Sequence, residues 1–209
     1  QGAQLTLRSV ECSVLSVKGT VSTLNTQHST LLGPAALWRL DQEWFRAVHE
    51  GSRREWLDPV MWVITSTGRG HVQGVVLLLV GLFSKRARPY AVACFWAAAL
   101  SGLVRLGIMR WADRMRPSNF AFAEPFESVY GTSSFPSGHT TTSFAIAFTL
   151  FFLTRTTRPW VGWVTLGWAG LVAFSRVYVG VHFPPDVLAA AALGMLAATV
   201  LELRRRRTA

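Results

Sequence analysis

The chain has 209 residues, of which 50% are hydrophobic and 15% charged, and its mean hydropathy is +0.30. This length suits one compact domain, and the apolar composition excludes a typical soluble globular protein. The formal net charge of +10 would suit a nucleic-acid binder, but the basic residues form brief clusters between apolar runs rather than one basic face. We therefore expect a polytopic membrane protein that does not bind nucleic acid.

The first 34 residues mix Ser, Thr, Gln and isolated Leu or Val without a sustained apolar run. They lack the basic start and apolar centre of a secretory signal, so we predict a poorly ordered extension over residues 1–34. Two short segments follow, of which 35–48 is amphipathic and 57–66 is apolar but brief. A sixth membrane span, if there is one, comes from this region.

Five further segments predict an all-α, polytopic membrane helix bundle that occupies residues 35–203. A bilayer core about 30 Å thick requires roughly 20 apolar helical residues, or somewhat fewer when flanking side chains reach the headgroups. The segments that meet this requirement, or nearly do, are 71–84, 90–109, 139–154, 159–174 and 186–203.

The connections between these segments alternate in charge. Two of them are basic, and so is the C-terminal run; by the positive-inside rule all three lie in the cytoplasm, with 204–209 as a basic cytoplasmic tail. The two remaining connections, 110–134 and 176–185, then lie on the extracytoplasmic face, which we take to be that of a bacterial inner membrane. The basic groups are Lys85, Arg86 and Arg88, then Arg155 and Arg158, then Arg204 to Arg207.

The first external connection opens with an arginine-rich run over residues 110–117. Guanidinium groups suit phosphoryl groups because they donate two parallel hydrogen bonds. Arg116 is the expected phosphate ligand, whereas Arg114 is at least as well explained as a surface charge facing lipid headgroups. The rest of the connection, 118–135, is interpreted as a passive loop, with a lid over the substrate headgroup as the alternative.

The next segment begins with Pro136, Ser137, Gly138 and His139. The proline fixes the chain direction, Ser137 is placed to cap the following helix, and Gly138 allows backbone N–H groups to approach an anion. Such a tripeptide alone usually marks only a turn before a helix. The adjacent His139 favours a phosphate site, because an imidazole can protonate a departing alkoxide near neutral pH.

The second external connection carries Ser175, Arg176 and His182, and Asp186 begins the last apolar segment. Two prolines separate His182 from Asp186 and start a new helix, so the carboxylate can turn back onto the imidazole. A histidine beside a membrane is often only an interfacial hydrogen-bonding residue. The nearby carboxylate and guanidinium favour a nucleophilic imidazole instead.

Taken together, these motifs resemble the type 2 phosphatidic acid phosphatase superfamily of integral-membrane lipid phosphatases, over roughly residues 41–203. That family has Lys, six residues and Arg-Pro, then Pro-Ser-Gly-His, then Ser-Arg, five residues, His, three residues and Asp. The second and third motifs match fully, whereas the first matches only at Arg116 and Pro117. Met109 stands at the position of the family Lys, and either Arg110 or Arg105 is placed to supply the missing cation.

The resemblance implies a phosphatase that works through a covalent phosphohistidine, without a metal ion or cofactor. His182 would attack phosphorus, Asp186 would orient the imidazole, and His139 would protonate the leaving oxygen. The phosphoryl oxygens would be held by Arg116, Arg176, the Ser137 hydroxyl and the Gly138 N–H, with Arg110 as a further candidate.

A site at the outer bilayer surface suits an amphiphilic substrate such as undecaprenyl pyrophosphate, phosphatidylglycerol phosphate or phosphatidic acid. Two alternatives stay open at this point. A catalytically idle, lipid-binding or scaffolding relative would explain Met109. A vanadate-binding, haloperoxidase-like protein would use His182 as a metal ligand, although those enzymes, like secreted acid phosphatases, are soluble.

Overall fold

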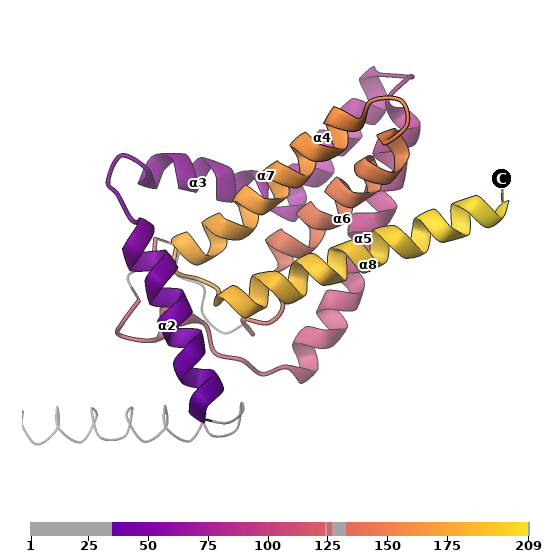
Figure 1. Ribbon diagram of the computed structural model, residues 1–209. Coiled ribbons are helices and arrows are strands. Elements are labelled where there is room, and N and C mark those ends of the chain that lie inside the picture. The colour runs from indigo at the N-terminus through magenta and orange to yellow at the C-terminus, as the bar shows by residue number, and fades with distance from the viewer. Residues whose placement is uncertain (1–34, 124, 127–132, 209) are drawn as a thin grey trace, which may run out of the picture. The chain divides into compact units, whose positions relative to one another are not determined.

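The computed structural model describes residues 35–123, 125–126 and 133–208, and every regular element in these ranges is helical. This finding confirms the prediction of an all-α fold. The predicted extension over residues 1–34 lies outside the described ranges. The helices are α2 (Ala35–Ser52), α3 (Asp58–Thr67), α4 (Gly70–Phe83), α5 (Arg88–Trp111), α6 (Gly138–Thr154), α7 (Pro159–Tyr178) and α8 (Pro184–Thr208), with a short 3-10 helix η1 (Pro117–Asn119) (Figure 1).

The chain divides into two compact units, residues Gln1–Glu43 and Trp44–Ala209. The described part of the first unit is the N-terminal half of α2. The second unit holds the remainder of α2 and all later helices, and it contains every residue of the three sequence motifs.

Helix α6 is the centre of the bundle and packs against α5, α7 and α8. Small residues allow the close approach of the neighbouring helices, as is common in membrane bundles. A Cβ atom added at Gly162 of α7 would lie 2.7 Å from the Cα atom of Phe151 in α6. One added at Gly194 of α8 would lie 2.7 Å from the backbone nitrogen of Ala145. These two glycines therefore set the spacing between α6 and its partners.

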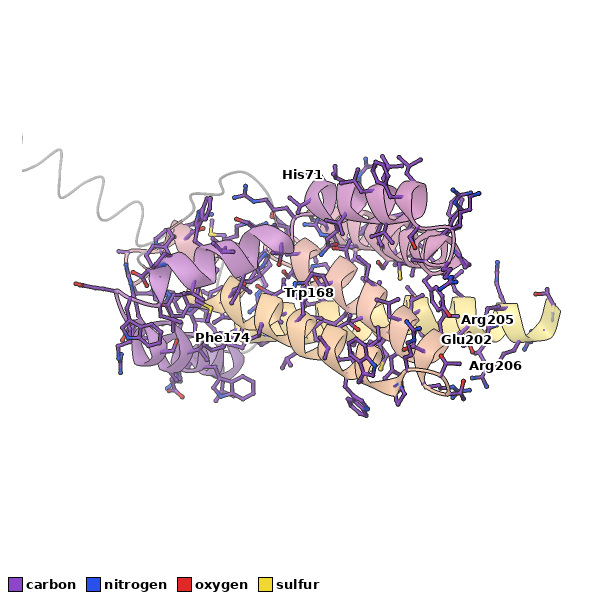
Figure 2. All side chains as sticks on the ribbon, turned by 90° about the horizontal axis from the view of Figure 1, so that it is seen from above. His71, Trp168, Phe174, Glu202, Arg205 and Arg206 are labelled. Carbon is purple, nitrogen blue, oxygen red and sulfur yellow. The ribbon has the colours of Figure 1, made fainter. Side chains whose placement is uncertain are left out.

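The five predicted segments coincide with α4 to α8 to within two residues, except that α7 and α8 extend four and five residues further at their C-terminal ends. Proline at the first or second position starts α5 and α7, where its fixed φ angle and missing N–H cost nothing. Helix α8 continues through the arginine run to Thr208, so the described part of the predicted basic tail belongs to the end of this helix. Glu202 accepts hydrogen bonds from Arg205 and Arg206 there, which stabilises the helical form (Figure 2).

Among the described helices, fewer qualify as membrane spans by length and composition than the five segments predicted from the sequence. By length and composition, α5 and α8 can each cross a membrane, and α3 with α4 can form a third span bent by 62°. The break falls at Gly68 and Arg69, where Arg69 adopts an extended conformation. Neither α2 nor α3 is a candidate span by itself among the described helices. Helix α6, with only 17 residues, is shorter than a typical span.

The helix ends that carry the motifs gather at one end of the second unit. In Figure 1 the C-terminus of α7 and the N-termini of α6 and α8 lie close together, and the α4–α5 and α6–α7 turns lie at the other end. The backbone N–H of Ser137 donates to the carbonyl of Asp186 at 3.3 Å, which fixes the start of α6 against the start of α8.

Candidate active site

Asp186 lies in the first turn of α8 and its side chain is completely buried. Its Oδ1 atom accepts a 2.6 Å hydrogen bond from Nη1 of Arg114, with which it forms an ion pair. Its Oδ2 atom accepts the backbone N–H of Phe183 at 2.9 Å and the hydroxyl of Ser134. A buried carboxylate requires such donors, because burial without them is costly. The side chain is therefore held in one orientation.

His182 stands four residues before Asp186, in the turn that links α7 to α8. Its Nδ1 atom lies 3.7 Å from Oδ2 of Asp186, which is longer than a hydrogen bond, and 3.5 Å from the Ser134 hydroxyl oxygen. Catalytic hydrogen bonds are often long in unliganded enzymes. The carboxylate and hydroxyl oxygens on this side favour a proton on Nδ1.

The other ring nitrogen of His182 faces a guanidinium group. Nη1 of Arg116 lies 3.1 Å from Nε2 of His182 and also donates to the carbonyl of Val181 at 3.1 Å. Since a guanidinium can only donate, Nε2 must be the accepting, unprotonated nitrogen. Burial, the largest effect, lowers the pKa of His182 to about 4, and the charge of Arg116 acts in the same direction, against the raising effect of Asp186. The imidazole is therefore neutral at physiological pH, with its lone pair on Nε2.

His139 is the second residue of α6 and lies within electrostatic reach of His182, Arg176 and Arg105. Its ring packs beside Gly68, where an added Cβ would lie 3.2 Å from Cδ2 of His139. The Nε2 atom of His139 is buried and makes no hydrogen bond to any described residue. The structure thus brings the two motif histidines into one charged cluster and leaves one nitrogen of His139 available to a ligand.

The predicted phosphate ligands surround the same place. Arg116 and Arg176 are almost completely buried, and Nη1 of Arg176 donates to the hydroxyl of Thr65 at 2.7 Å. Ser137 is at the N-cap position of α6, but the predicted capping bond from its side chain is absent, and its hydroxyl instead accepts from Thr140 at 3.1 Å. The prediction of a side-chain cap was therefore wrong, and the Ser137 hydroxyl caps none of the backbone N–H groups at the start of α6.

The two candidates for the missing cation have different surroundings. Nε of Arg105 donates to the carbonyl of Pro136 at 3.1 Å, and a Cβ added at Gly138 would lie 3.2 Å from Cζ of Arg105. The Arg110 side chain is exposed and makes no hydrogen bond or ion pair within the described part of the chain. Arg105 is four residues before Met109 and shares its helix face, whereas Arg110 is turned by about 100° from it. The structure therefore brings Arg105, and not Arg110, to the Pro136–Gly138 segment.

Three residues at or beside the site were not predicted to act there. Ser134 contacts both His182 and Asp186, and Arg114, interpreted as a surface charge, pairs with Asp186. His49 of α2 is 2% exposed and its Nδ1 lies 2.7 Å from the carbonyl of Tyr178, just before the His182 turn. The four-residue spacing of Phe45 and His49 on one helix face is the only sequence signal for the last of these, and the two rings are stacked.

Across the described residues there is no group of three or more His, Cys, Asp or Glu side chains placed as metal ligands.

Comparison with known proteins agrees with the motif resemblance. The bacitracin transport permease protein BcrC of Bacillus licheniformis is 46% identical over 66 residues, which are 32% of this chain and 30% of that protein. The undecaprenyl-diphosphatase of Sulfolobus acidocaldarius is 34% identical over 145 residues, 66% of each chain. The chain thus spans two thirds or less of the length of these curated relatives.

A solved structure shares the fold over almost its full length. The crystal structure of a transmembrane PAP2 type phosphatidylglycerolphosphate phosphatase from Bacillus subtilis matches with a TM-score of 0.72 and 25% sequence identity, covering 90% of this chain and 95% of that one. The sequence model of the PAP2 superfamily matches residues 59–208, which include all three motifs. On the evidence of this match and of the shared fold, the chain belongs to the PAP2 superfamily.

Proposed function

We propose that the protein is a membrane lipid phosphatase that hydrolyses a phosphomonoester or pyrophosphate through a phosphohistidine on His182. One observation carries the proposal, namely the buried, neutral imidazole whose Nε2 lone pair faces Arg116 while its Nδ1 faces Asp186 and Ser134. This is the arrangement that a nucleophilic imidazole requires, since one nitrogen attacks and the other keeps its proton.

In the first chemical step the substrate phosphate replaces Nε2 of His182 as the acceptor for Arg116. Nε2 then attacks phosphorus, the bond from phosphorus to the leaving oxygen breaks, and His139 gives that oxygen a proton. The imidazolium that forms on His182 is stabilised by the Asp186 carboxylate beside Nδ1. Arg176, Arg105, the Ser137 hydroxyl and the backbone N–H of Gly138 compensate the charge on the non-bridging oxygens.

In the second step water attacks the phosphohistidine and His139 accepts a proton from that water. The N–P bond breaks, inorganic phosphate leaves, and His182 returns to its neutral form. The residues of this chain supply every proton transfer in this scheme, so it needs no metal ion or cofactor.

The substrate is proposed to be a lipid, because the outer surface of the bundle is apolar. Leu103, Trp96 and Phe83 are 68%, 61% and 84% exposed, as expected for side chains that face lipid rather than water. Two similar proteins are named undecaprenyl-diphosphatase and phosphatidylglycerophosphatase, which are names of enzymes for a prenyl and a glycerolipid phosphate. Undecaprenyl pyrophosphate, phosphatidylglycerol phosphate and phosphatidic acid are the proposed candidates.

We further propose that helices α4 to α8 each cross the membrane and form the phosphatase domain, with the active site on the extracytoplasmic side of a bacterial inner membrane. The α4–α5 and α6–α7 turns and the C-terminal end of α8, which carry the basic groups, lie at the opposite end from the N-terminus of α8 (Figure 1), as the positive-inside rule requires. Phosphate groups at headgroup depth would then reach His182 while the tails stay in the lipid.

The test is phosphate release by the purified protein from a panel of prenyl, glycerolipid and sphingolipid phosphates in the presence of EDTA. We expect turnover in EDTA, inhibition by orthovanadate, and loss of at least about a thousandfold in kcat for His182→Ala. His71→Ala, which alters an exposed histidine of α4 (Figure 2), is the matched control and should retain activity. Loss of turnover in EDTA, or an active His182→Ala variant, would contradict the proposal, and no turnover on any lipid would favour an idle relative.

A further inference from the structure

A groove in the helix bundle lies away from the active site. A groove of about 940 Å³ opens between α4 and the helices α5, α6 and α7. This volume is near the upper limit of the roughly 300–1,000 Å³ typical of ligand pockets. Apolar side chains line most of its length, among them Val76, Val80, Ala91, Ile146, Leu150 and Val161.

The two ends of the groove differ in chemistry. Arg86 and Arg158 line one end, together with the hydroxyls of Ser84 and Thr157. Both guanidinium groups are exposed, and the structure gives neither a hydrogen bond nor an ion pair with any residue that it describes. They are the only charged side chains among the described residues that line the groove. The two guanidinium groups are therefore available to an anionic headgroup at the mouth of the groove.

The other end is polar but uncharged. Nε1 of Trp168 (labelled in Figure 2) donates to the Thr67 hydroxyl at 2.9 Å, and Nε2 of Gln73 donates to the Ser143 hydroxyl at 2.7 Å. These bonds use the Trp168 N–H and one N–H of Gln73, and the groups at this end of the groove offer no charge to a ligand. The ligand that fits must therefore be anionic at one end only and apolar along the rest.

The length of the groove matches one leaflet. The groove runs along α4 from Val72 to Ser84, the C-cap of the helix, and this stretch rises by about 18 Å at 1.5 Å per residue. That is about half of a hydrocarbon core roughly 30 Å thick. The occupant consequently spans a single leaflet, on the side of the two arginines.

The cationic end is far from the reacting phosphate. Helix α6 has 17 residues, with Gly138 at the active site and Thr154 at the groove's cationic end, so the two places are about 25 Å apart along the helix. An anion bound by Arg86 and Arg158 is thus a second ligand and not the substrate phosphate.

We propose that the groove binds an anionic phospholipid of the leaflet opposite the active site, with its headgroup phosphate between Arg86 and Arg158 and one acyl chain along the groove towards Gln73. The charge of the two guanidinium groups selects the headgroup, and the apolar walls select the chain. Under the topology proposed above this leaflet is the cytoplasmic one. The bound lipid fills the space that separates α4 from α6 and α7, so it stabilises α4 in its place.

The experiment measures lipid retention by native mass spectrometry of the delipidated full chain in detergent, titrated with phosphatidylglycerol or phosphatidylcholine. We expect one tightly retained phosphatidylglycerol, weakened at least tenfold in the pair Arg86→Gln and Arg158→Gln. The matched pair, Lys85→Gln and Arg155→Gln, removes the same charge from the same two turns but from residues that do not line the groove, and should change retention less than twofold. Equal weakening in both pairs, or equal retention of phosphatidylcholine, would overturn the proposal.

Two further arms identify which part of the lipid is recognised. Leu150→Trp narrows the groove without changing charge and should lower phosphatidylglycerol retention while thermal stability shows that the protein is folded. Glycerol phosphate and inorganic phosphate, which have no acyl chain, should not displace the lipid at millimolar concentration. Displacement by either, or a change of oligomeric mass instead of lipid retention in Leu150→Trp, would show that a free anion or a protein helix occupies the groove. Because the readout is binding, failure here leaves the phosphatase proposal intact.

Discussion

At the scale of single residues, the Asp186 carboxylate joins three separate parts of the chain. Arg114 lies near the start of the connection between α5 and α6, Ser134 lies near its end, and Phe183 lies in the turn before α8. The carboxylate therefore positions its neighbours as much as they position it. Variants that remove one donor should disturb catalysis through the orientation of His182.

Replacement of Ser134 by Ala tests this positioning role. The variant removes the hydroxyl that contacts both Nδ1 of His182 and Oδ2 of Asp186. Because a hydrogen bond to a charged group is worth about 1.5–3 kcal/mol, we expect kcat to fall by roughly tenfold to a hundredfold with little change in KM. Ser101→Ala, which removes a buried hydroxyl bonded within α5, is the control. A raised KM with unchanged kcat would assign Ser134 to substrate binding instead.

Arg105 and Arg110 make a second matched pair at this scale. Arg105 contacts the Pro136 carbonyl and lies against Gly138, whereas Arg110 is exposed. We expect Arg105→Ala to lower kcat/KM by roughly tenfold or more, because it removes a charge near the phosphoryl oxygens, and Arg110→Ala to change it less than about twofold. Steady-state kinetics on one lipid phosphate measures both. The reverse order would mean that the α5 terminus moves when substrate binds.

The titration of His182 is a third test. Burial lowers the pKa of His182 to about 4 from its ordinary value of 6.5, so the ring stays neutral until the pH falls well below 6. Below that pKa, Nε2 is protonated and cannot attack. Nitrogen-15 NMR of histidine-labelled protein, with His182→Asn for assignment, should show the imidazole of His182 still neutral at pH 5.5. A His182 midpoint near 6.5 would contradict the buried, neutral nucleophile.

At the scale of helices, the bundle depends on close approach to α6. Gly162 of α7 faces the Phe151 backbone, with only 2.7 Å available to an added Cβ atom. The Cβ clash would force α7 away from α6, because backbone atoms cannot move aside as a flexible side chain does.

Gly162→Ala should therefore lower the thermal stability of the detergent-purified protein, with an expected loss of about 1–3 kcal/mol, the usual cost of overpacking. Gly167→Ala in the same helix meets no atom within 4 Å and should be neutral or stabilising, because alanine favours helix by about 1 kcal/mol over glycine. Thermal unfolding of both variants decides the point. Equal destabilisation would show that glycine at position 162 serves flexibility rather than packing.

At the scale of the whole molecule, the sequence predicted the features that depend on local spacing. The apolar segments predicted the positions of α4 to α8. The four-residue interval between His182 and Asp186 predicted that the carboxylate lies beside the imidazole. The Arg116 contact with His182 was predictable only through the family resemblance, because the two residues are far apart in the chain.

The features that the sequence could not supply depend on long-range packing. The Arg114 and Ser134 contacts with Asp186 are set by the path of the connection between α5 and α6, which carries no periodic pattern. The bend between α3 and α4 arises at Gly68, where a side chain would strike Val172 and His139. The apolar pattern separated 57–66 from 71–84 at this break, but it gave no sign that the two helices could together form one bent span.

The central claim is that His182 forms a covalent bond to phosphorus, and it is tested most directly by trapping that bond. A single turnover with a lipid carrying a labelled phosphate should be quenched in alkali, in which phosphohistidine is stable, and the label located by peptide mass spectrometry. We expect the phosphoryl group on Nε2 of His182, and no label in His182→Ala. Label on another residue, or complete turnover with no labelled protein at any time, would contradict the account.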